Sequence, residues 1–357
     1  MSFAQMPSNT AEAMNDTPTA PSAQSLPSAR AVMRRLIDAV RTEVMGRDEV
    51  IELCVIALVA DGHVLLEDFP GSGKTTLAKT LGEAIVDTQT PEPEAGVSST
   101  PEISAFRRIQ FTPDLLPSDV TGVPIFDPND NSFHFRRGPL FAHVVLADEI
   151  NRTSPKVQSA MLEAMGEKQI TVDDTTYPLG ELFFVIATQN PLDLAGTYPL
   201  PIPQLDRFLF KLKMDPIERD AELQVLNAHS PSSAKTRKAV PRISRTELLE
   251  ARSALAELVE ISPAIKTALV DISRALRSDP RVLQGNSTRS MVLLLPALQA
   301  AAALDDRDYV SAADIERLLP RVLGHRLVLA PTAGDCHTLI REVMAQPMEQ
   351  LARSTLR

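Results

Sequence analysis

Short, almost wholly apolar runs alternate with segments of helical periodicity through the first two thirds of the 357-residue chain. The runs are residues 63–69, 108–112, 143–149, 182–189 and 208–214. Continuous hydrophobicity, rather than alternation with polar residues, is typical of strands that are covered on both faces of a parallel sheet. Residues 154–167 begin with Ser-Pro and place apolar residues on one face, as a helix does. The alternation predicts a doubly wound α/β domain over residues 29–217.

The pattern changes beyond this domain. Residues 218–243 are interpreted as a connecting helix and a linker, because their second half is rich in Ser, Pro and Lys. From 244 to 345, one N-capping signal after another opens a helical segment, which predicts a smaller all-helical domain. A C-terminal tail is expected over 346–357. A disordered tail is expected over 1–28, which is rich in Ser, Pro and Ala and lacks apolar periodicity.

Three shorter segments interrupt the α/β pattern. Residues 122–139 and 170–179 each contain two strand-like runs around a turn signal, which predicts two β-hairpins. Residues 88–104 are polar and proline-rich and are expected to form an exposed loop.

The charge balance and the apolar runs limit the classes of partner. With 46 acidic against 36 basic residues, the chain repels a polyphosphate backbone overall, so nucleic acid is not expected as its main partner. The longest apolar run, residues 291–304, is interrupted by Pro296 and is too short to cross a bilayer, so no membrane insertion is expected. The N-terminus has no basic region followed by an apolar core, so a cytoplasmic location is expected.

The stretch EDFPGSGKTT, from Glu67 to Thr76, matches a phosphate-binding loop with one departure. The pattern Gly-x-x-x-x-Gly-Lys-[Ser/Thr] has Asp68 in place of its first glycine. A predicted strand precedes the loop and a predicted helix follows it, so helix N-terminal N–H groups would face the phosphates. Lys74 would contact the β- and γ-phosphates, and Thr75 would bind Mg²⁺. We interpret the loop as a working cradle for ATP or ADP, since an ordinary residue fits its entry position.

Two further strand ends carry polar residues suited to hydrolysis. The run VVLADEIN predicts a buried strand that presents Asp148, to hold Mg²⁺ through its water shell, and Glu149, to polarise the attacking water. Asn190 ends the next apolar run and is expected beside the same water. The alternatives are a buried strand with a solvated acidic end, and an Asn that serves only the turn before Pro191.

Two arginines are candidates for contact with the γ-phosphate. Arg207 opens the fifth predicted strand, where it would act as an arginine finger on a neighbouring subunit's ATP or serve as an ordinary surface ion-pair residue. Arg289 begins a helix of the second domain, from which we expect it to reach back to the nucleotide. Pro296 follows in that helix and is expected to kink it.

Together these motifs resemble the MoxR family of AAA+ ATPases. The resemblance extends over residues 30–332 and is carried by FRRIQFTPDLLPSDVTG, FRRGPLFAHVVLADEINRTSPKVQSAMLEAMGEKQITVD and FFVIATQNPLDLAGTYPLPIPQLDRF. It implies a five-stranded parallel sheet of order 5-1-4-3-2 and a helical lid. It also implies a ring, commonly a hexamer, with ATP at the subunit boundaries.

The resemblance implies roles for single residues. It places Walker A at Pro70, Gly71, Ser72, Gly73, Lys74, Thr75 and Thr76. It places Walker B at Asp148 and Glu149, sensor 1 at Asn190, the finger at Arg207 and sensor 2 at Arg289. The segment near the adenine would be Val44, Met45 and Gly46. Arg152 is a further candidate for action across the subunit interface.

The two predicted hairpins are similar to insertions that, in this group of AAA+ proteins, often project into the ring and touch clients. Arg136 and Arg137 would make such a contact, or would form the solvated edge of a hairpin. The loop at 88–104 is longer than the family usually has.

The resemblance implies an ATP-driven ring that remodels or activates protein clients together with a partner bearing a von Willebrand factor A domain. A nucleotide-gated scaffold with little turnover and a nucleic-acid motor are the alternatives. The set Glu149, Asn190 and Arg207 argues against the scaffold, and the acidic net charge argues against the motor. A small-molecule kinase would leave Arg207 and Arg289 without a role.

Overall fold

The computed structural model describes residues 25–67, 71–87, 103–129, 131–190, 196–228 and 241–355. Most of the expected tail and loop (1–28 and 88–104), the expected linker around 229–240, and the positions of Asp68 and Pro70 lie outside these residues. The first element, helix α1 (Leu26–Arg41), begins within the segment expected to be the N-terminal tail.

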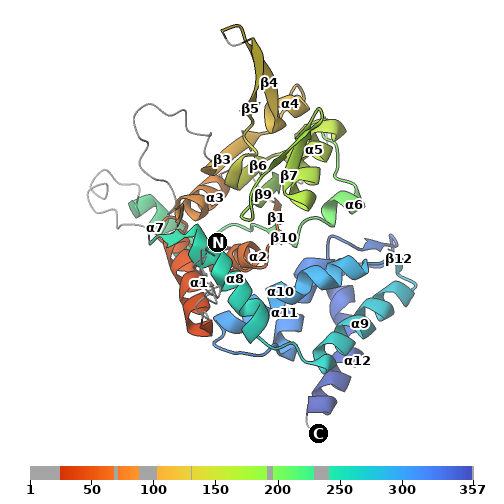
Figure 1. The fold of residues 1–357 in the computed structure, drawn as a ribbon. Coiled ribbons are helices and arrows are strands. Elements are labelled where there is room, and N and C mark those ends of the chain that lie inside the picture. Colours follow the sequence, from red (N-terminus) through yellow and green to blue (C-terminus); the bar gives the residue numbers. More distant parts are fainter. Residues whose placement is uncertain are drawn as a thin grey trace, which may run out of the picture.

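A five-stranded parallel sheet forms the centre of the α/β domain (Figure 1). Its strands follow the order β10 (Phe210–Lys213), β1 (Val64–Glu67), β9 (Phe184–Gln189), β6 (Ala142–Asp148) and β3 (Ser104–Gln110). Numbered along the chain this is 5-1-4-3-2, so the predicted sheet and its implied topology are confirmed. Every residue of β6 is buried, as its continuous apolar run predicts.

The register of the strands brings their carboxyl ends to one edge of the sheet. Glu67 pairs with Gln189 on one side and with Lys213 on the other, and Gln110 pairs with Asp148. Ligands of parallel α/β sheets bind in the crevice outside this edge. The loop after β1 and the acidic end of β6 therefore meet where a ligand is expected.

Helices cover both faces of the sheet and bury two separate apolar clusters. After α1, the helical elements of this part of the chain are α2 (Asp48–Val59), α3 (Lys74–Glu83), α4 (Pro117–Thr121), the 3₁₀ turn η1 (Ile150–Arg152), α5 (Pro155–Glu167), α6 (Ile202–Leu205) and α7 (Arg219–Ala228), of which α6 and α7 contain no buried residue. Leu65 and Leu66 of β1 belong to different clusters, because successive side chains of a strand point to opposite faces. The sheet is thus a layer between two apolar interfaces.

The second domain is helical, as predicted, with one small addition. Its helices are α8 (Arg245–Leu258), α9 (Pro263–Ser278), α10 (Thr288–Leu304), α11 (Ala312–Leu323) and α12 (Cys336–Thr355). Strands β12 (Val282–Gln284) and β13 (Val328–Leu329) form an antiparallel pair beside them. Helix α10 continues on both sides of Pro296 as one element. The C-terminal tail expected over 346–357 is instead helical as far as Thr355.

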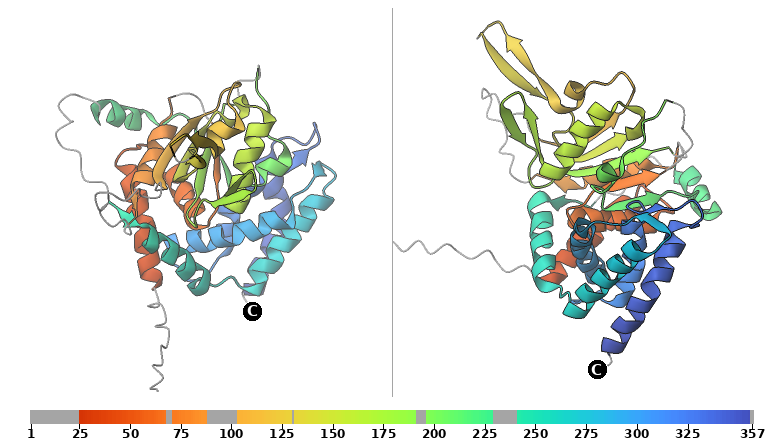
Figure 2. Two further views of the ribbon diagram at one scale, coloured as in Figure 1. Left: turned by 45° about the horizontal axis from the view of Figure 1, so that its top comes forward. Right: turned by 90° about the vertical axis from the view of Figure 1, so that its right-hand side faces the viewer.

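The lid packs beneath the sheet and shares a core with it (Figure 2). Helix α8 contacts α1, and α10 contacts α2. The short parallel pair of β2 (Ile85–Val86) and β11 (Ile243–Ser244) joins the two domains as well. One apolar cluster extends from α1–α3 through the lid helices, so the lid is held against the α/β domain by a buried interface rather than by its linker alone.

Both predicted hairpins are confirmed. They are β4 (Gly122–Asp127) with β5 (Ser132–Arg137), and β7 (Gln169–Val172) with β8 (Thr175–Pro178). The β4–β5 hairpin projects from the end of the α/β domain that lies away from the lid (Figure 1). Phe135 at its base stacks on Tyr177 of the second hairpin, with ring centroids 4.0 Å apart. Phe133 near its tip is 71% exposed.

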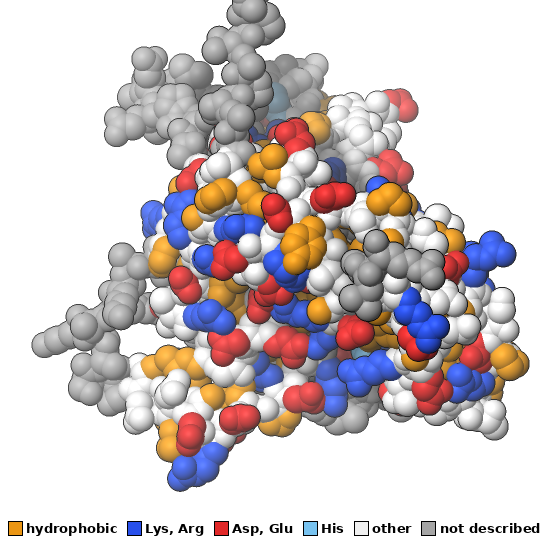
Figure 3. Space-filling view, turned by 90° about the horizontal axis from the view of Figure 1, so that it is seen from below, with side chains coloured by type: hydrophobic (Ala, Val, Ile, Leu, Met, Phe, Trp, Pro, Cys, Tyr) orange, Lys and Arg blue, Asp and Glu red, His pale blue; other side chains and the backbone are white. Residues whose placement is uncertain are grey.

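The surface on the lid side mixes charges of both signs. Lys and Arg side chains are interspersed with Asp and Glu across this face (Figure 3). Such mixing differs from the single-sign stripe that tracks a nucleic-acid backbone. Among the helices that the structure describes, none combines the length and the apolar character needed to cross a bilayer.

Candidate nucleotide-binding site

The loop after β1 opens onto a cavity of about 270 Å³ at the carboxyl edge of the sheet. It is lined by Gly71, Ser72, Gly73, Lys74, Thr75, Thr76, Arg108, Gln110, Asp148, Glu149 and Asn190. We call it the nucleotide cavity. Gly71 and Gly73 have φ angles of +90° and +94°, which a residue with a side chain rarely adopts. A Cβ atom at either glycine would meet nothing within 4 Å, so the loop backbone faces open space.

The residues of this cavity fit the phosphates of a nucleotide. Helix α3 begins at Lys74, so the N–H groups of its first turn lie at the cavity, where they favour an anion. The buried Oγ of Ser72 has no hydrogen-bond partner among the described residues. A buried hydroxyl without a partner is uncommon, and a phosphate oxygen would supply one. Pro70, which was also expected here, lies outside the described residues.

A threonine on the neighbouring strand fixes the Asp148–Glu149 pair. The backbone N–H of Glu149 donates to Thr188 Oγ1 at 2.9 Å, and that hydroxyl donates to Asp148 Oδ1 at 2.7 Å. Glu149 has a φ of +58°, at the turn from β6 into η1. Thr188 was not singled out from the sequence. Its position two residues before Asn190, at the end of a strand adjacent to β6, was the available signal that it lies near Asp148 and Glu149.

Strand β3 contributes two polar side chains that the sequence reasoning missed. Arg108 Nη2 donates to Asp148 Oδ2 at 2.6 Å. Gln110 Nε2 donates to Glu149 Oε2 at 3.0 Å. The available signal was their spacing: residues two apart on a strand share a face, and this strand pairs with β6. Both carboxylates of the cavity therefore have partners from β3.

The other expected residues lie at different distances from the cavity. Asn190 lines it, as expected. Arg152 Nε lies 3.0 Å from Glu149 Oε2 of the same chain, and its candidate role across the interface stays a prediction. Val44, Met45 and Gly46 do not line it; a Cβ at Gly46 would lie 2.6 Å from Ala221 of α7, so this segment packs beside the connecting helix.

Neither Arg207 nor Arg289 lines the nucleotide cavity of its own chain. The guanidinium of Arg207 donates to the carbonyl of Leu162 in α5 and lies over Gly166, where a Cβ would come within 2.5 Å of Nη1. Arg289 is exposed at the start of α10. That Arg289 reaches back to a nucleotide therefore stays a prediction, since the side chain does not line this cavity.

Three family models match successive parts of the chain. A model described as the MoxR domain in the MoxR-vWA-beta-propeller ternary systems matches residues 31–92. The model of the ATPase family associated with various cellular activities (AAA) matches residues 95–210. A model of the AAA lid domain matches residues 274–345. The matches follow the division into an α/β domain and a lid.

Similarity to whole proteins decides the family. The uncharacterized protein YeaC of Bacillus subtilis (strain 168) is 41% identical over 330 residues, which cover 91% of this chain and 97% of that protein. Chaperone MoxR1 of Mycobacterium tuberculosis is 33% identical over 312 residues, which cover 86% and 78%. This chain belongs to the MoxR family of AAA+ ATPases.

The fold of this MoxR-family chain is similar to a solved structure as well. The crystal structure of a proposed ATPase from Cytophaga hutchinsonii has a TM-score of 0.77 and 34% sequence identity, and the match covers 89% of this chain and 95% of that one. The MoxR-family chain is thus an ATPase. Its nucleotide cavity holds the loop and the carboxylates, and its two candidate arginines lie elsewhere.

Proposed function

We propose that this MoxR-family ATPase hydrolyses ATP at the boundaries between subunits of a ring, commonly a hexamer, and uses the reaction to remodel or activate protein clients. The observation that carries the proposal is the composition of the nucleotide cavity. The cavity gathers the phosphate loop, both carboxylates and Asn190, yet it lacks Arg207 and Arg289. A cavity that has water-activating groups but lacks both candidate finger and sensor arginines is suited to completion by a second copy of the chain.

The residues of the cavity divide the work of hydrolysis. Lys74 contacts the β- and γ-phosphates of ATP, and the N–H groups at the start of α3 bind the phosphate oxygens. Thr75 and Asp148 would hold Mg²⁺. When bound, Mg²⁺ neutralises the charge that develops on the phosphate oxygens. Glu149 orients and polarises the attacking water, and Asn190 holds the same water in place.

Arg207 and Arg289 serve the ATP of the neighbouring subunit. A guanidinium supplied across an interface stabilises the charge of the transition state and contributes roughly a thousandfold or more in rate. Both arginines belong to one region of the surface, because Asp206 accepts hydrogen bonds from Ser287 and Ser290 at the start of α10. The chain segments that carry these two arginines are thus joined through Asp206, and we expect both to face one neighbouring site.

The client side of the ring is formed by the hairpins. The tip of β4–β5 exposes Phe126 and Phe133, whose ring centroids lie 5.2 Å apart, and Arg136 follows on β5. Exposed aromatic side chains with a nearby arginine are typical of protein contacts. A partner bearing a von Willebrand factor A domain is the proposed recipient, because the model matching residues 31–92 is described by ternary systems that contain vWA.

Glu149→Gln tests the proposal. The variant should bind ATP with Mg²⁺, form the same ring as the unchanged protein and release on the order of 100- to 10,000-fold less phosphate, since it keeps the cavity and loses the base. Client or partner activation should stop with turnover. Activation that persists in the variant would support the scaffold instead. A chain that stays monomeric with ATP and Mg²⁺ and releases no phosphate at any concentration would overturn the proposal.

A further inference from the structure

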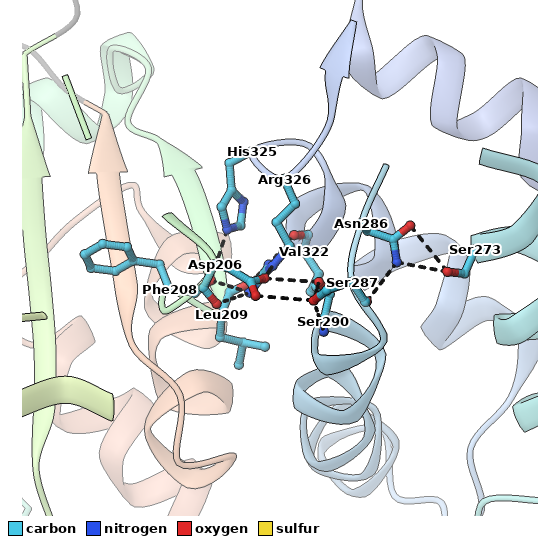
Figure 4. A network of polar contacts seen from close by, with 10 residues as sticks. All are labelled: Asp206, Phe208, Leu209, Ser273, Asn286, Ser287, Ser290, Val322, His325 and Arg326. Carbon is cyan, nitrogen blue, oxygen red and sulfur yellow. Dashed lines mark hydrogen bonds and ion pairs between the residues drawn. The ribbon is translucent and has the colours of Figure 1, made fainter. Parts of the chain in front are cut away.

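A buried ion pair joins the lid to the residue that precedes Arg207. Asp206 follows α6, and Arg326 follows α11 in the lid. The side chain of Arg326 is only 2% exposed, and its Nε donates to Asp206 Oδ1 at 2.6 Å (Figure 4). The two residues are 120 positions apart in the chain, so this contact exists only when the lid is docked.

Every N–H of the Arg326 guanidinium has an acceptor. A guanidinium carries five N–H donors. Beyond Nε, its two terminal nitrogens donate to the backbone carbonyls of Asp206 at 3.0 Å, Phe208 at 2.7 Å, Leu209 at 3.2 Å and Val322. All but the last of these acceptors belong to residues 206–209, which we call the arginine segment. The lid therefore holds the chain immediately before and immediately after Arg207.

The same carboxylate holds the turn that carries Arg289. Ser287 Oγ donates to Asp206 Oδ2 at 3.3 Å, and Ser290 Oγ donates to Asp206 Oδ1 at 3.1 Å (Figure 4). Ser287 is also the N-cap residue of α10, so these bonds involve the first turn of the helix. Asp206 is thus the neighbour of Arg207 in sequence and the acceptor for two residues that flank Arg289.

We propose that Asp206 and Arg326 are positioning residues, which hold Arg207 and Arg289 as one unit facing the ATP of the neighbouring subunit. The inference rests on the proposed function, in which both arginines act across the interface. A buried ion pair is weak evidence for a gain in stability, because desolvation offsets much of the attraction. The planar guanidinium of Arg326 instead fixes the orientation of the groups that accept its hydrogen bonds. Direction matters here, since a displacement of about 1 Å at a reacting group costs on the order of 100-fold in rate.

Mixed rings separate positioning from a general structural role. One subunit carries Lys74→Ala, which disables its own cavity and leaves its arginines. The other carries Arg207→Ala, which keeps its cavity and removes the finger. Mixed in equal amounts, the two should release phosphate faster than either alone, because the intact cavity of the second meets the intact arginines of the first. Failure of this mixture to recover turnover would overturn the proposed function itself.

Arg326→Gln is then added to one subunit at a time. On the Lys74→Ala subunit it should lower the recovered turnover by on the order of 10- to 100-fold, because that subunit supplies the arginines. On the Arg207→Ala subunit it should leave the recovered turnover nearly unchanged. Equal losses in both placements, or no loss in either, would overturn the positioning role. ATP binding and the melting temperature are measured for each variant.

Two further variants keep the test decisive. Arg252 of α8 is a matched control, since this buried lid arginine donates to the Leu58 carbonyl at 2.6 Å and pairs with Asp61 at 2.8 Å, before the start of β1. Arg252→Gln should show no difference between the two placements. If Arg326→Gln does not fold, the double change Ser287→Ala and Ser290→Ala removes the two hydroxyl bonds to Asp206, together with the N-cap bond that Ser287 Oγ accepts from the N–H of Ser290. The same one-sided loss, smaller in size, is expected, and its absence would overturn the inference.

Discussion

The nucleotide cavity and the arginine segment differ in what fixes their geometry. The cavity is built from the phosphate loop and from strand ends whose register is set by the sheet; Gln110 pairs with Asp148 within it. The arginine segment is held by Arg326 and by the start of α10, both from the lid, in addition to the bond from Arg207 to the Leu162 carbonyl of α5. The α/β domain is therefore sufficient to shape the first region, whereas the second also depends on the docked lid.

The difference separates binding from turnover. A change in the pose of the lid would move Arg207 and Arg289 and leave the contacts among Asp148, Glu149 and Thr188 in place. In the proposed ring, every subunit would then hold ATP and hydrolyse it only where a neighbouring lid is docked. Coupling of this kind needs an element that has two arrangements, here the lid, and the nucleotide cavity and the arginine segment must each bind ATP or act on it better in one of them.

Among the changes that distinguish the nucleotide cavity from the arginine segment, Arg207→Ala should have the largest effect on ATP turnover. Turnover at saturating ATP should fall roughly a thousandfold, since the guanidinium that stabilises the transition state is lost. ATP affinity should stay the same, because Arg207 does not line the cavity. Phosphate release and calorimetric ATP titration measure the two quantities. Lys74→Ala is the contrasting variant and should lose ATP binding. A parallel loss of affinity in Arg207→Ala would remove the distinction between the two regions.

Acid should lower the free energy of unfolding and so affect both regions together. His63, directly before β1, is bonded both to the arginine segment and to strand β9 of the sheet. Its carbonyl accepts the N–H of Leu209 at 2.8 Å, and its ring accepts from Val185 at Nδ1, so Nε2 donates to Met165. Burial lowers the pKa of His63 to about 4. An unfolded histidine has a pKa of about 6.5 and takes up its proton first as the pH falls. The free energy of unfolding should therefore fall between about pH 6.5 and pH 4, by about 2 kcal/mol at pH 5.

Urea unfolding at pH 7.5, 6 and 5 measures this loss. Carboxylates titrate over part of the same range, so the comparison is with His63→Gln, which keeps a donor and an acceptor but does not titrate. The variant should lose about 2 kcal/mol less than the unchanged protein between pH 7.5 and pH 5. An identical pH dependence in both proteins would show that His63 takes up its proton while folded.

Arg108→Gln should affect the cavity alone. Among the described residues lining it, the cationic side chains are Lys74 and Arg108. Loss of one charge-assisted contact to phosphate should weaken ATP binding about tenfold when Mg²⁺ is absent. ATP titration in EDTA measures it. Arg107→Gln is the matched control, because Arg107 bonds Ser104 at 3.1 Å and does not line the cavity. Equal ATP affinities of the two variants would mean that Arg108 pairs with Asp148 and does not contact the phosphates.

The sequence predicts the cavity better than the arginine segment for a physical reason. The phosphate loop is a run of consecutive residues, and the acidic and amide residues end apolar runs whose strands are adjacent in the sheet. Arg108 and Gln110 were not predicted, because the sequence of a strand does not show which residues of the adjacent strand its polar side chains contact. The pair Asp206–Arg326 escapes because nothing in the sequence relates positions 120 apart.

Burial also decides where helices end. Residues 346–357 were expected to be a tail, yet α12 runs to Thr355 with Pro347 inside it. Met344, Met348 and Leu351 are buried in the core that the lid shares with the α/β domain. Packing of an amphipathic face outweighs the local cost of an interior proline. Both hairpins followed from patterns that local residues carry in full, whereas the strand order was implied by the resemblance to the family.

Phe133→Ser should have the smallest effect on the nucleotide cavity and on the arginine segment, because it lies in neither region. The side chain is 71% exposed near the tip of β4–β5, far along the chain from both the cavity loop and the lid. Turnover without client should not change, and the free energy of unfolding should shift by no more than about 0.5 kcal/mol. Binding of the proposed von Willebrand factor A-domain partner, measured by calorimetry, should weaken, because an exposed aromatic side chain is lost. Leu283→Ser, at a 67% exposed position of the lid, is the matched control and should bind normally. Equal binding by both variants would move the client contact away from this hairpin and leave the cavity and the arginine segment as before.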